Sequence, residues 1–320
     1  MSEPLFLFSL PRSGSTLLQR MMAVHPDIAT ASELWFLLPF VYTLRKAGVV
    51  AQYSHVSLSG AMEDMLTALP NGSKDYYQAL GGFAREIYEK LNVGGNRYFL
   101  DKTPRYYLIV EEIGRAFPDA RFIFLFRNPL AVLASTIESF YRGRIGDPYH
   151  AIDIFRGPHD LAAGYEALRE RSLALSFESL VCEPEREMRR VCDYLSIPFV
   201  EDMVAGFADV KLNGRMGDRI GTKAYDRVSG ETVEKWRRTL NNVVRRAYAR
   251  RYLRSLGRET TERLGYDLDE LLAELNRVDV SYHGSIRDVY DLAVGWLIAR
   301  SELRLLIAKR NADRGGFVHI

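Results

Sequence analysis

Short apolar runs alternate with longer amphipathic segments along much of the chain. Residues 5–10, 97–101, 121–126 and 173–177 are short enough to be strands, and a helical pattern follows the runs ending at 10, 101, 126 and 177. Runs this apolar are typical of strands buried on both faces of a parallel sheet. Repeated strand–helix units imply right-handed crossovers, so the sequence predicts an α/β fold with a parallel central sheet flanked by helices.

The remaining segments carry no strand period. Residues 40–96 are predicted to be helices with loops, residues 142–158 a loop or lid, and the chain after about residue 235 almost wholly helical. The apolar run 290–308 contains Arg300, Glu302 and Arg304, so we interpret it as an amphipathic helix and expect no membrane span.

Composition narrows the class of protein only slightly. With 320 residues, 47% hydrophobic and 26% charged, the chain suits one large soluble domain, with or without an appendage. A net charge of +2 gives no global preference for polyanions, so any anion site must come from local clusters. The spacing of Cys182 and Cys192 suits neither a redox pair nor a zinc site. We therefore expect ordinary thiols, no metal and a cytoplasmic location.

The sequence Pro-Arg-Ser-Gly-Ser-Thr follows the first apolar run. Backbone N–H groups that enter a helix form a nest for anions, and the helix dipole adds positive potential. Gly14 lets the backbone approach a ligand, Ser15 and Thr16 add hydroxyl donors, and Arg12 adds a cation. The pattern predicts a phosphate loop that lacks the Walker A lysine spacing. A Ser-Gly turn that only caps a helix is the alternative.

A second motif, Arg-Asn-Pro, ends the strand at 121–126. Arg127 lies at the strand end, and Ser135 lies about two turns into the next helix. A second phosphate could bind between these two side chains. The alternatives are a salt bridge at the strand end for Arg127 and an exposed helix hydroxyl for Ser135.

Together, PRSGST and FRNPLAVLAS resemble the motifs of the PAPS-dependent sulfotransferase superfamily, with bacterial-type features closer to tyrosylprotein-like members than to cytosolic ones. The resemblance covers roughly residues 4–30, 97–140, 172–200 and 215–240. It implies a P-loop-nucleotide-kinase-like sulfotransferase fold. We expect a PAPS-binding domain over residues 1–258 and a helical C-terminal extension over 259–320 that packs on it.

The resemblance also implies roles for residues. The 5′-phosphosulfate would be gripped by the first loop, with Arg12, Ser13, Gly14, Ser15 and Thr16. Arg127 and Ser135 would bind the 3′-phosphate, and Lys223 in a late Gly-containing loop would close over it. Phe177 stands where relatives often have tyrosine, so a hydroxyl near the adenine would be lost.

Three residues are expected at the reacting centre: Glu33, Lys102 and Arg12, which with Lys102 would stabilise charge on the transferring group. In the family the lysine of a DKTP stretch approaches the sulfuryl group, which assigns Lys102; a surface lysine is the alternative. Pro104 stands where many cytosolic members carry a catalytic histidine, so that base is missing. Glu33 matches the glutamate that serves as base in other members, and the apolar neighbours 34–38 suit that role. A helix-capping glutamate is its alternative, and His25 is predicted to be a loop residue.

The sequence thus predicts in-line transfer of a sulfuryl group from PAPS to a hydroxyl of a small molecule or carbohydrate, with PAP as product. The rival functions are an ATP-dependent kinase and a non-catalytic PAP-binding protein.

The basic stretch 235–258 is either a solvated face or a dock for an anionic carrier, and it carries no nucleic-acid-binding motif. The helical tail either packs on the core or mediates a homodimer. Trp236 is predicted to be a core residue.

Overall fold

The computed structural model describes residues 1–51, 53–140, 143–146, 148–210, 212 and 230–301. These residues form a five-stranded sheet in the order β2-β3-β1-β4-β5, in which every pairing is parallel. The strands are β1 (Glu3–Ser9), β2 (Ile28–Thr30), β3 (Tyr98–Asp101), β4 (Arg121–Phe126) and β5 (Ser172–Ser176). The predicted α/β fold with a parallel central sheet is therefore confirmed.

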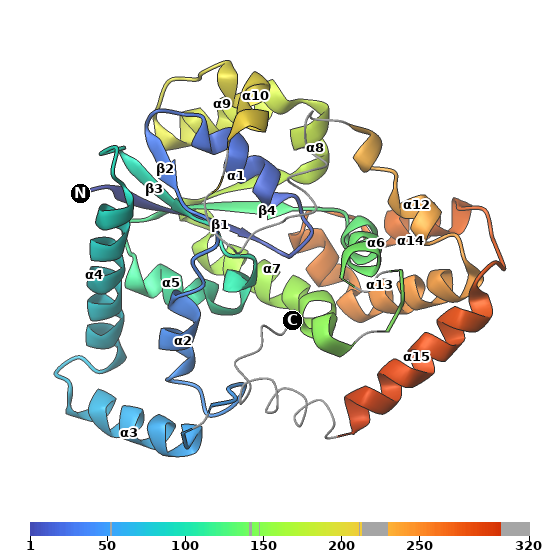
Figure 1. The fold of residues 1–320 in the computed structure, drawn as a ribbon, viewed down its shortest axis with the longest axis horizontal. Coiled ribbons are helices and arrows are strands. Elements are labelled where there is room, and N and C mark those ends of the chain that lie inside the picture. Colours follow the sequence, from blue (N-terminus) through green and yellow to red (C-terminus); the bar gives the residue numbers. More distant parts are fainter. Residues whose placement is uncertain (52, 141–142, 147, 211, 213–229, 302–320) are drawn as a thin grey trace.

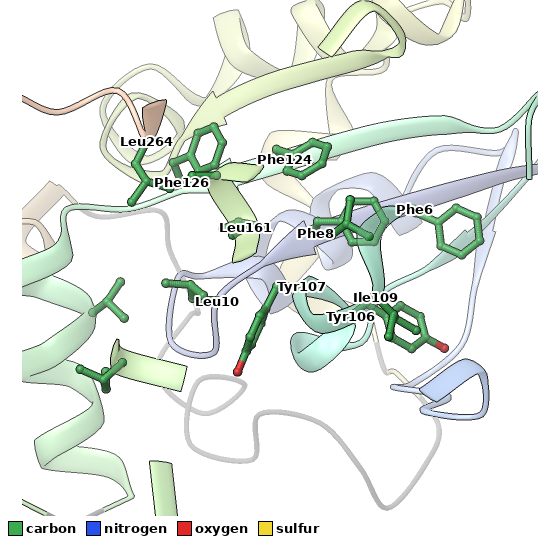
Figure 2. Packing of buried hydrophobic residues seen from close by; sticks show 14 of the residues in the cluster. Phe6, Phe8, Leu10, Tyr106, Tyr107, Ile109, Phe124, Phe126, Leu161 and Leu264 are labelled. Atoms are coloured by element: carbon green, nitrogen blue, oxygen red, sulfur yellow. The ribbon is translucent and has the colours of Figure 1, made fainter. Parts of the chain in front are cut away.

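The central strand β1 sends its side chains alternately into two hydrophobic clusters. Leu5 and Leu7 face one cluster, and Phe6 and Phe8 face the other. The aromatic cluster continues across β4, where the ring of Phe122 stacks on those of Phe6 and Phe8. Figure 2 shows part of this cluster, including Phe6 and Phe8 of β1 and Phe124 and Phe126 of β4. Because both faces are covered, β1 needs no polar alternation, as the sequence pattern indicated.

Helices cover both faces of the sheet (Figure 1). The aliphatic face is covered by α1 (Ser15–Ala23), α8 (Phe177–Cys182), α9 (Pro184–Leu195) and α10 (Asp202–Ala205). The aromatic face is covered by α4 (Ser73–Leu91), α5 (Val110–Ala116), α6 (Pro129–Ser139), α7 (Gly157–Leu168), α12 (Trp236–Thr239), α13 (Val243–Arg263) and α14 (Leu268–Arg277). More peripheral helices are α2 (Leu37–Tyr42), α3 (His55–Ala68) and α15 (Ser285–Arg300).

Two sequence-based predictions were wrong in detail. The edge strand β2 was missed, because three residues are too few to show a hydrophobic period. The segment 142–158 was predicted to be a loop or lid, but it contains a 3₁₀ turn at Pro148–His150 and a π-helical turn at Ile152–Arg156 that leads into α7. Within that turn, buried Asp153 accepts hydrogen bonds from Arg105 and Tyr107. These bonds fold the segment against the core.

The C-terminal helices share the main core. Leu264, Leu271 and Leu275 belong to the same buried cluster as Phe126, and Figure 2 shows Leu264 beside that ring. Helix α13 is interrupted at Gly257, whose φ is 71°, close to the predicted domain boundary at residue 258. The division into two domains stays a prediction. Trp236 is 2% exposed, as expected of a core residue.

The basic face of α13 has a structural use. Arg246 donates a hydrogen bond to the carbonyl oxygen of Asn276 on α14, and Arg250 donates to the side-chain oxygen of the same residue. These bonds tie α14 to α13, and docking of an anionic carrier stays a prediction. None of the helices in the described ranges is both long and apolar enough to cross a bilayer.

Helices α4 and α5 approach closely at a glycine, which gives a prediction. A Cβ on Gly81 would lie 2.1 Å from the carbonyl oxygen of Ala116, whereas a Cβ on its exposed neighbour Gly82 would meet nothing within 4 Å. Gly81→Ala should lower the free energy of unfolding by about 1–3 kcal/mol through overpacking. Gly82→Ala, the matched control, should raise it by about 0.5–1 kcal/mol. Urea unfolding of both variants checks this, and equal effects would contradict the close approach.

Candidate active site

The loops that carry the predicted site residues leave the same edge of the sheet. In a parallel sheet the carboxyl ends of all strands lie together, and ligands bind where loops leave those ends. Residues 10–14 follow β1, residues 31–36 follow β2, residues 102–103 follow β3 and residues 127–128 follow β4. The parallel pairing therefore assembles four separate sequence segments at one place.

The loop after β1 is shaped for an anion. Arg12 and Gly14 both have left-handed backbones, with φ of 69° and 88°. Gly14 is the residue before α1, whose first N–H groups have no partner within a helix and can bind an anion. A Cβ on Gly14 would lie 2.3 Å from the ring of Phe177. Glycine is thus required here both for its conformation and for its lack of a side chain.

The residues predicted to bind the second phosphate lie directly against this loop. Arg127 donates a hydrogen bond of 2.7 Å to the carbonyl oxygen of Arg12, and its guanidinium lies 4.2 Å from the centre of the Phe177 ring. The Arg12 Nε atom donates to the Ser135 Oγ atom over 3.2 Å. Arg12, Arg127 and Ser135 therefore form one cluster. Phe177 takes a structural role here, because its ring packs on both Gly14 and Arg127.

Two residues that the sequence analysis missed hold the second motif in place. Glu178 accepts a hydrogen bond of 3.0 Å from the backbone N–H of Asn128, and its other oxygen accepts one of 2.7 Å from the Tyr266 hydroxyl. Burial and the Glu178 carboxylate raise the pKa of Tyr266 well above its usual range, so this hydroxyl stays a donor. No sequence signal links these residues, because they lie far apart along the chain.

A third cluster lies on the other side of the loop. Lys102 Nζ lies 2.8 Å from Glu33 Oε1 and 3.4 Å from the hydroxyl of Thr16. The side chains of Lys102 and Glu33 are only 1% and 8% exposed, so the alternative of a surface lysine is wrong. The other carboxylate oxygen of Glu33 accepts a 3.1 Å hydrogen bond from the indole N–H of Trp35.

The missed strand β2 explains how Glu33 reaches this place. Because β2 pairs with β3, the residues after both strands lie side by side. The side chain of buried Gln19 donates hydrogen bonds of 2.8 Å to the Thr30 hydroxyl and to the Ala31 carbonyl, which anchors this segment to α1. Helix α2 begins only at Leu37, so Glu33 lies in a loop, and its alternative as a helix-capping residue is wrong.

Asp101, next to Lys102, was also missed. It is 1% exposed, and its Oδ2 atom accepts hydrogen bonds from the hydroxyls of Tyr88 (2.8 Å) and Tyr106 (3.1 Å). Burial raises the pKa of this carboxyl from its usual 3.8 to about 6, although the two hydroxyls favour the anion. The cluster fixes the end of β3 from which Lys102 projects.

His25, which the sequence analysis predicted to be a loop residue, is not part of these clusters. His25 bonds the Pro198 carbonyl through one ring nitrogen and accepts from the Asp27 N–H through the other, in keeping with a loop residue. Lys223 lies outside the described residues. Among the described residues, no three acidic, His or Cys side chains are grouped so that they could hold a metal ion.

Comparison with known proteins supports the resemblance found in the sequence. Residues 4–202 match the model of the family described as Sulfotransferase family. The nodulation protein NoeE of Sinorhizobium fredii is 30% identical over 263 residues, which are 73% of this chain and 60% of that protein. A protein-tyrosine sulfotransferase of Drosophila melanogaster is 25% identical over 61% of this chain and 38% of its own length. The chain thus spans less than two thirds of either relative.

Solved structures give a weaker match. The sulfotransferase domain of the Synechococcus olefin synthase superimposes with a TM-score of 0.49 and 22% identity, over 74% of this chain and 88% of that domain.

The raised pKa of Asp101 predicts a pH-dependent stability. Folding stabilises the protonated carboxyl, so this contribution is complete below pH 3.8 and is lost as the pH rises through about 6. A shift of this size corresponds to about 3 kcal/mol. Asp101→Asn keeps an acceptor for both tyrosines and cannot ionise. Its free energy of unfolding, minus that of the wild type, should therefore increase by up to about 3 kcal/mol between pH 4 and pH 8.

Urea unfolding of both proteins across that pH range measures the difference. A difference that stays constant with pH would show that Asp101 ionises as easily in the folded as in the unfolded chain.

Proposed function

The chain belongs to the sulfotransferase family, and from this premise we propose that it transfers a sulfuryl group from PAPS to an acceptor hydroxyl and releases PAP. The observation that carries the proposal is the contact between Arg127 and the backbone of Arg12. It joins the two motifs that resemble the binding groups for the two ends of this donor. A nucleotide with a 5′-phosphosulfate and a separate 3′-phosphate needs two such adjoining anion sites.

We assign the donor contacts as follows. The backbone nest at residues 12–16 and the start of α1 bind the 5′-phosphate, with the hydroxyls of Ser13, Ser15 and Thr16 as further donors. Arg127, Ser135 and Arg12 form the cationic cluster for the 3′-phosphate. Arg12 belongs both to the loop and to this cluster, so we propose that its guanidinium also neutralises charge at the sulfuryl end. Lys223 stays a candidate for the 3′-phosphate.

Chemistry is assigned to the third cluster. Glu33 accepts the proton of the acceptor hydroxyl as its oxygen forms a bond to sulfur. The bond between sulfur and the bridging oxygen breaks, and the electron pair leaves with PAP. Lys102, which also lies near the hydroxyl of Thr16, stabilises negative charge on the transferring group and that oxygen. In-line alignment of acceptor, sulfur and leaving group supplies much of the acceleration.

The acceptor is proposed to be a hydroxyl of a small molecule or a carbohydrate. Relatives named protein-tyrosine sulfotransferases show by their name that a protein hydroxyl can also be the acceptor in this family. Because Glu33 is the proposed base, we expect the acceptor to bind beside Glu33.

Transfer of radioactive sulfate tests the function. The protein is incubated with [³⁵S]PAPS and a panel of phenols, sugars and tyrosine peptides, and both labelled product and PAP are measured. Labelled product supports the proposal. Binding of PAP without any transfer would favour the non-catalytic rival, and magnesium-dependent turnover of ATP would favour the kinase.

Replacing the proposed base should separate turnover from binding. A positioned base contributes about 10²–10⁴-fold to the rate, so Glu33→Gln should lower kcat by that factor. The affinity for PAP, measured by calorimetry, should stay close to that of the wild type. Glu63→Gln, at an exposed position on α3, is the control. Unchanged turnover in Glu33→Gln would remove this residue from the mechanism.

Arg127 should matter most for the 3′-phosphate. Removal of one charge-assisted hydrogen bond costs about 1.5–3 kcal/mol, so Arg127→Ala should weaken PAP binding by that amount. The loss for AMP, which lacks the 3′-phosphate, should be smaller. Exposed Arg251 provides the matched control Arg251→Ala. If Arg127→Ala weakened the binding of PAP and of AMP equally, Arg127 would only stabilise the loop and would not contact the 3′-phosphate.

A further inference from the structure

In the structure Glu33 is held from two sides. One carboxylate oxygen faces Lys102 Nζ at 2.8 Å, and the other accepts from the Trp35 indole N–H at 3.1 Å. The Lys102 side chain is 1% exposed and that of Glu33 is 8% exposed, so this ion pair is almost inaccessible to solvent. A buried carboxylate needs such partners, because burial without them would disfavour its anionic form.

Lys102 and Trp35, the two partners of Glu33, have different roles in the proposed reaction. Lys102 also lies 3.4 Å from the hydroxyl of Thr16 in the phosphate loop, so its ammonium stands between donor site and base. In the proposed reaction, a sulfuryl group bound there would attract the Lys102 ammonium away from Glu33. The indole of Trp35 is assigned no contact with the donor in the proposed reaction. As Lys102 turns to the donor, Trp35 becomes the group that keeps the Glu33 carboxylate oriented.

The backbone of Trp35 is built for this contact. Its φ of 60° is left-handed, which is rare for a bulky side chain and persists only where surrounding contacts enforce it. The Thr103 hydroxyl oxygen accepts a 3.2 Å hydrogen bond from the Trp35 N–H, and the Trp35 carbonyl accepts one of 3.2 Å from Leu38. Thr103 directly follows Lys102, so one short segment carries both the lysine and the anchor for Trp35.

We propose that Trp35 is a positioning residue: its indole N–H, held in place through Thr103, orients the Glu33 carboxylate for proton transfer while Lys102 serves the donor. This inference rests on the proposed function, in which Glu33 is the base.

Nuclear magnetic resonance tests the contact without any acceptor. The chain has three tryptophans, so protein labelled with ¹⁵N-tryptophan gives three indole signals. The signal lost in Trp35→Phe is that of Trp35. Glu33→Gln should move this signal, and the signals of Trp236 and Trp296 should stay in place. Thr103→Val should also move it, whereas Thr103→Ser, which keeps the hydroxyl, should not. An unmoved Trp35 signal in Glu33→Gln would overturn the contact.

A double-mutant cycle tests its role in catalysis. Turnover is measured with [³⁵S]PAPS and 4-methylphenol, whose hydroxyl keeps its proton at neutral pH, or as sulfate release to water where this phenol is not sulfated. Loss of a hydrogen bond to a charged group predicts a roughly 10- to 100-fold lower kcat for Trp35→Phe. The KM for PAPS should not change. In the Glu33→Gln background, Trp35→Phe should have little further effect, since both changes disable one unit.

The outcomes separate the two claims. If Glu33→Gln lowers kcat but Trp35→Phe does not, the positioning role is wrong and the proposed base stands. The same conclusion follows if Trp35→Phe lowers kcat equally in both backgrounds, because its effect then does not pass through Glu33. If Glu33→Gln leaves kcat unchanged, the proposed base fails, and the role of Trp35 fails with it.

Discussion

The parallel pairing of four strands is the constraint on which the site depends. Because β2, β3, β1 and β4 run in the same direction, the loops that follow them leave one edge of the sheet. No two of these loops are adjacent in the sequence. The side chains of β1 alternate, with leucines toward one face of the sheet and phenylalanines toward the other. Because a shift of register would reverse these faces, this alternation holds β1 in its register and so holds the end of the strand in place. Packing of the strands therefore determines where the loops that carry the proposed functional residues lie.

The polar groups at this edge are costly for stability and are arranged in pairs. Removing Lys102 and Glu33 from water disfavours both charges, and a well-packed apolar pair of similar volume is often no less stable. The same holds for Asp101, which burial makes harder to ionise even with two tyrosine donors. Such arrangements make sense where a site must hold charge in place before the ligand arrives, since preorganised charges need no rearrangement during the reaction. The ring of Phe177 contributes differently, as an apolar support for Arg127.

The sequence was sufficient for whatever depends on local pattern. Apolar strands, the glycine of the loop after β1 and the position of Ser135 on α6 all follow from short segments, and the structure agrees with each. Contacts between distant segments could not be predicted in this way. Strand β2 is too short to show a period, and without it nothing placed Glu33 beside Lys102 except the resemblance to a family. Tyr266, Glu178 and Trp35 act through hydrogen bonds that form only after folding, so no pattern marks them.

In the proposed function, two adjoining anion sites bind one nucleotide with phosphates at both ends. Calorimetric titration of the wild-type protein with PAP and, separately, with AMP tests this most directly. One charge-assisted contact to the 3′-phosphate predicts that PAP binds roughly 10- to 150-fold more tightly than AMP. Equal affinity for the two nucleotides would contradict the claim, because the cluster of Arg12, Arg127 and Ser135 would then not recognise a 3′-phosphate.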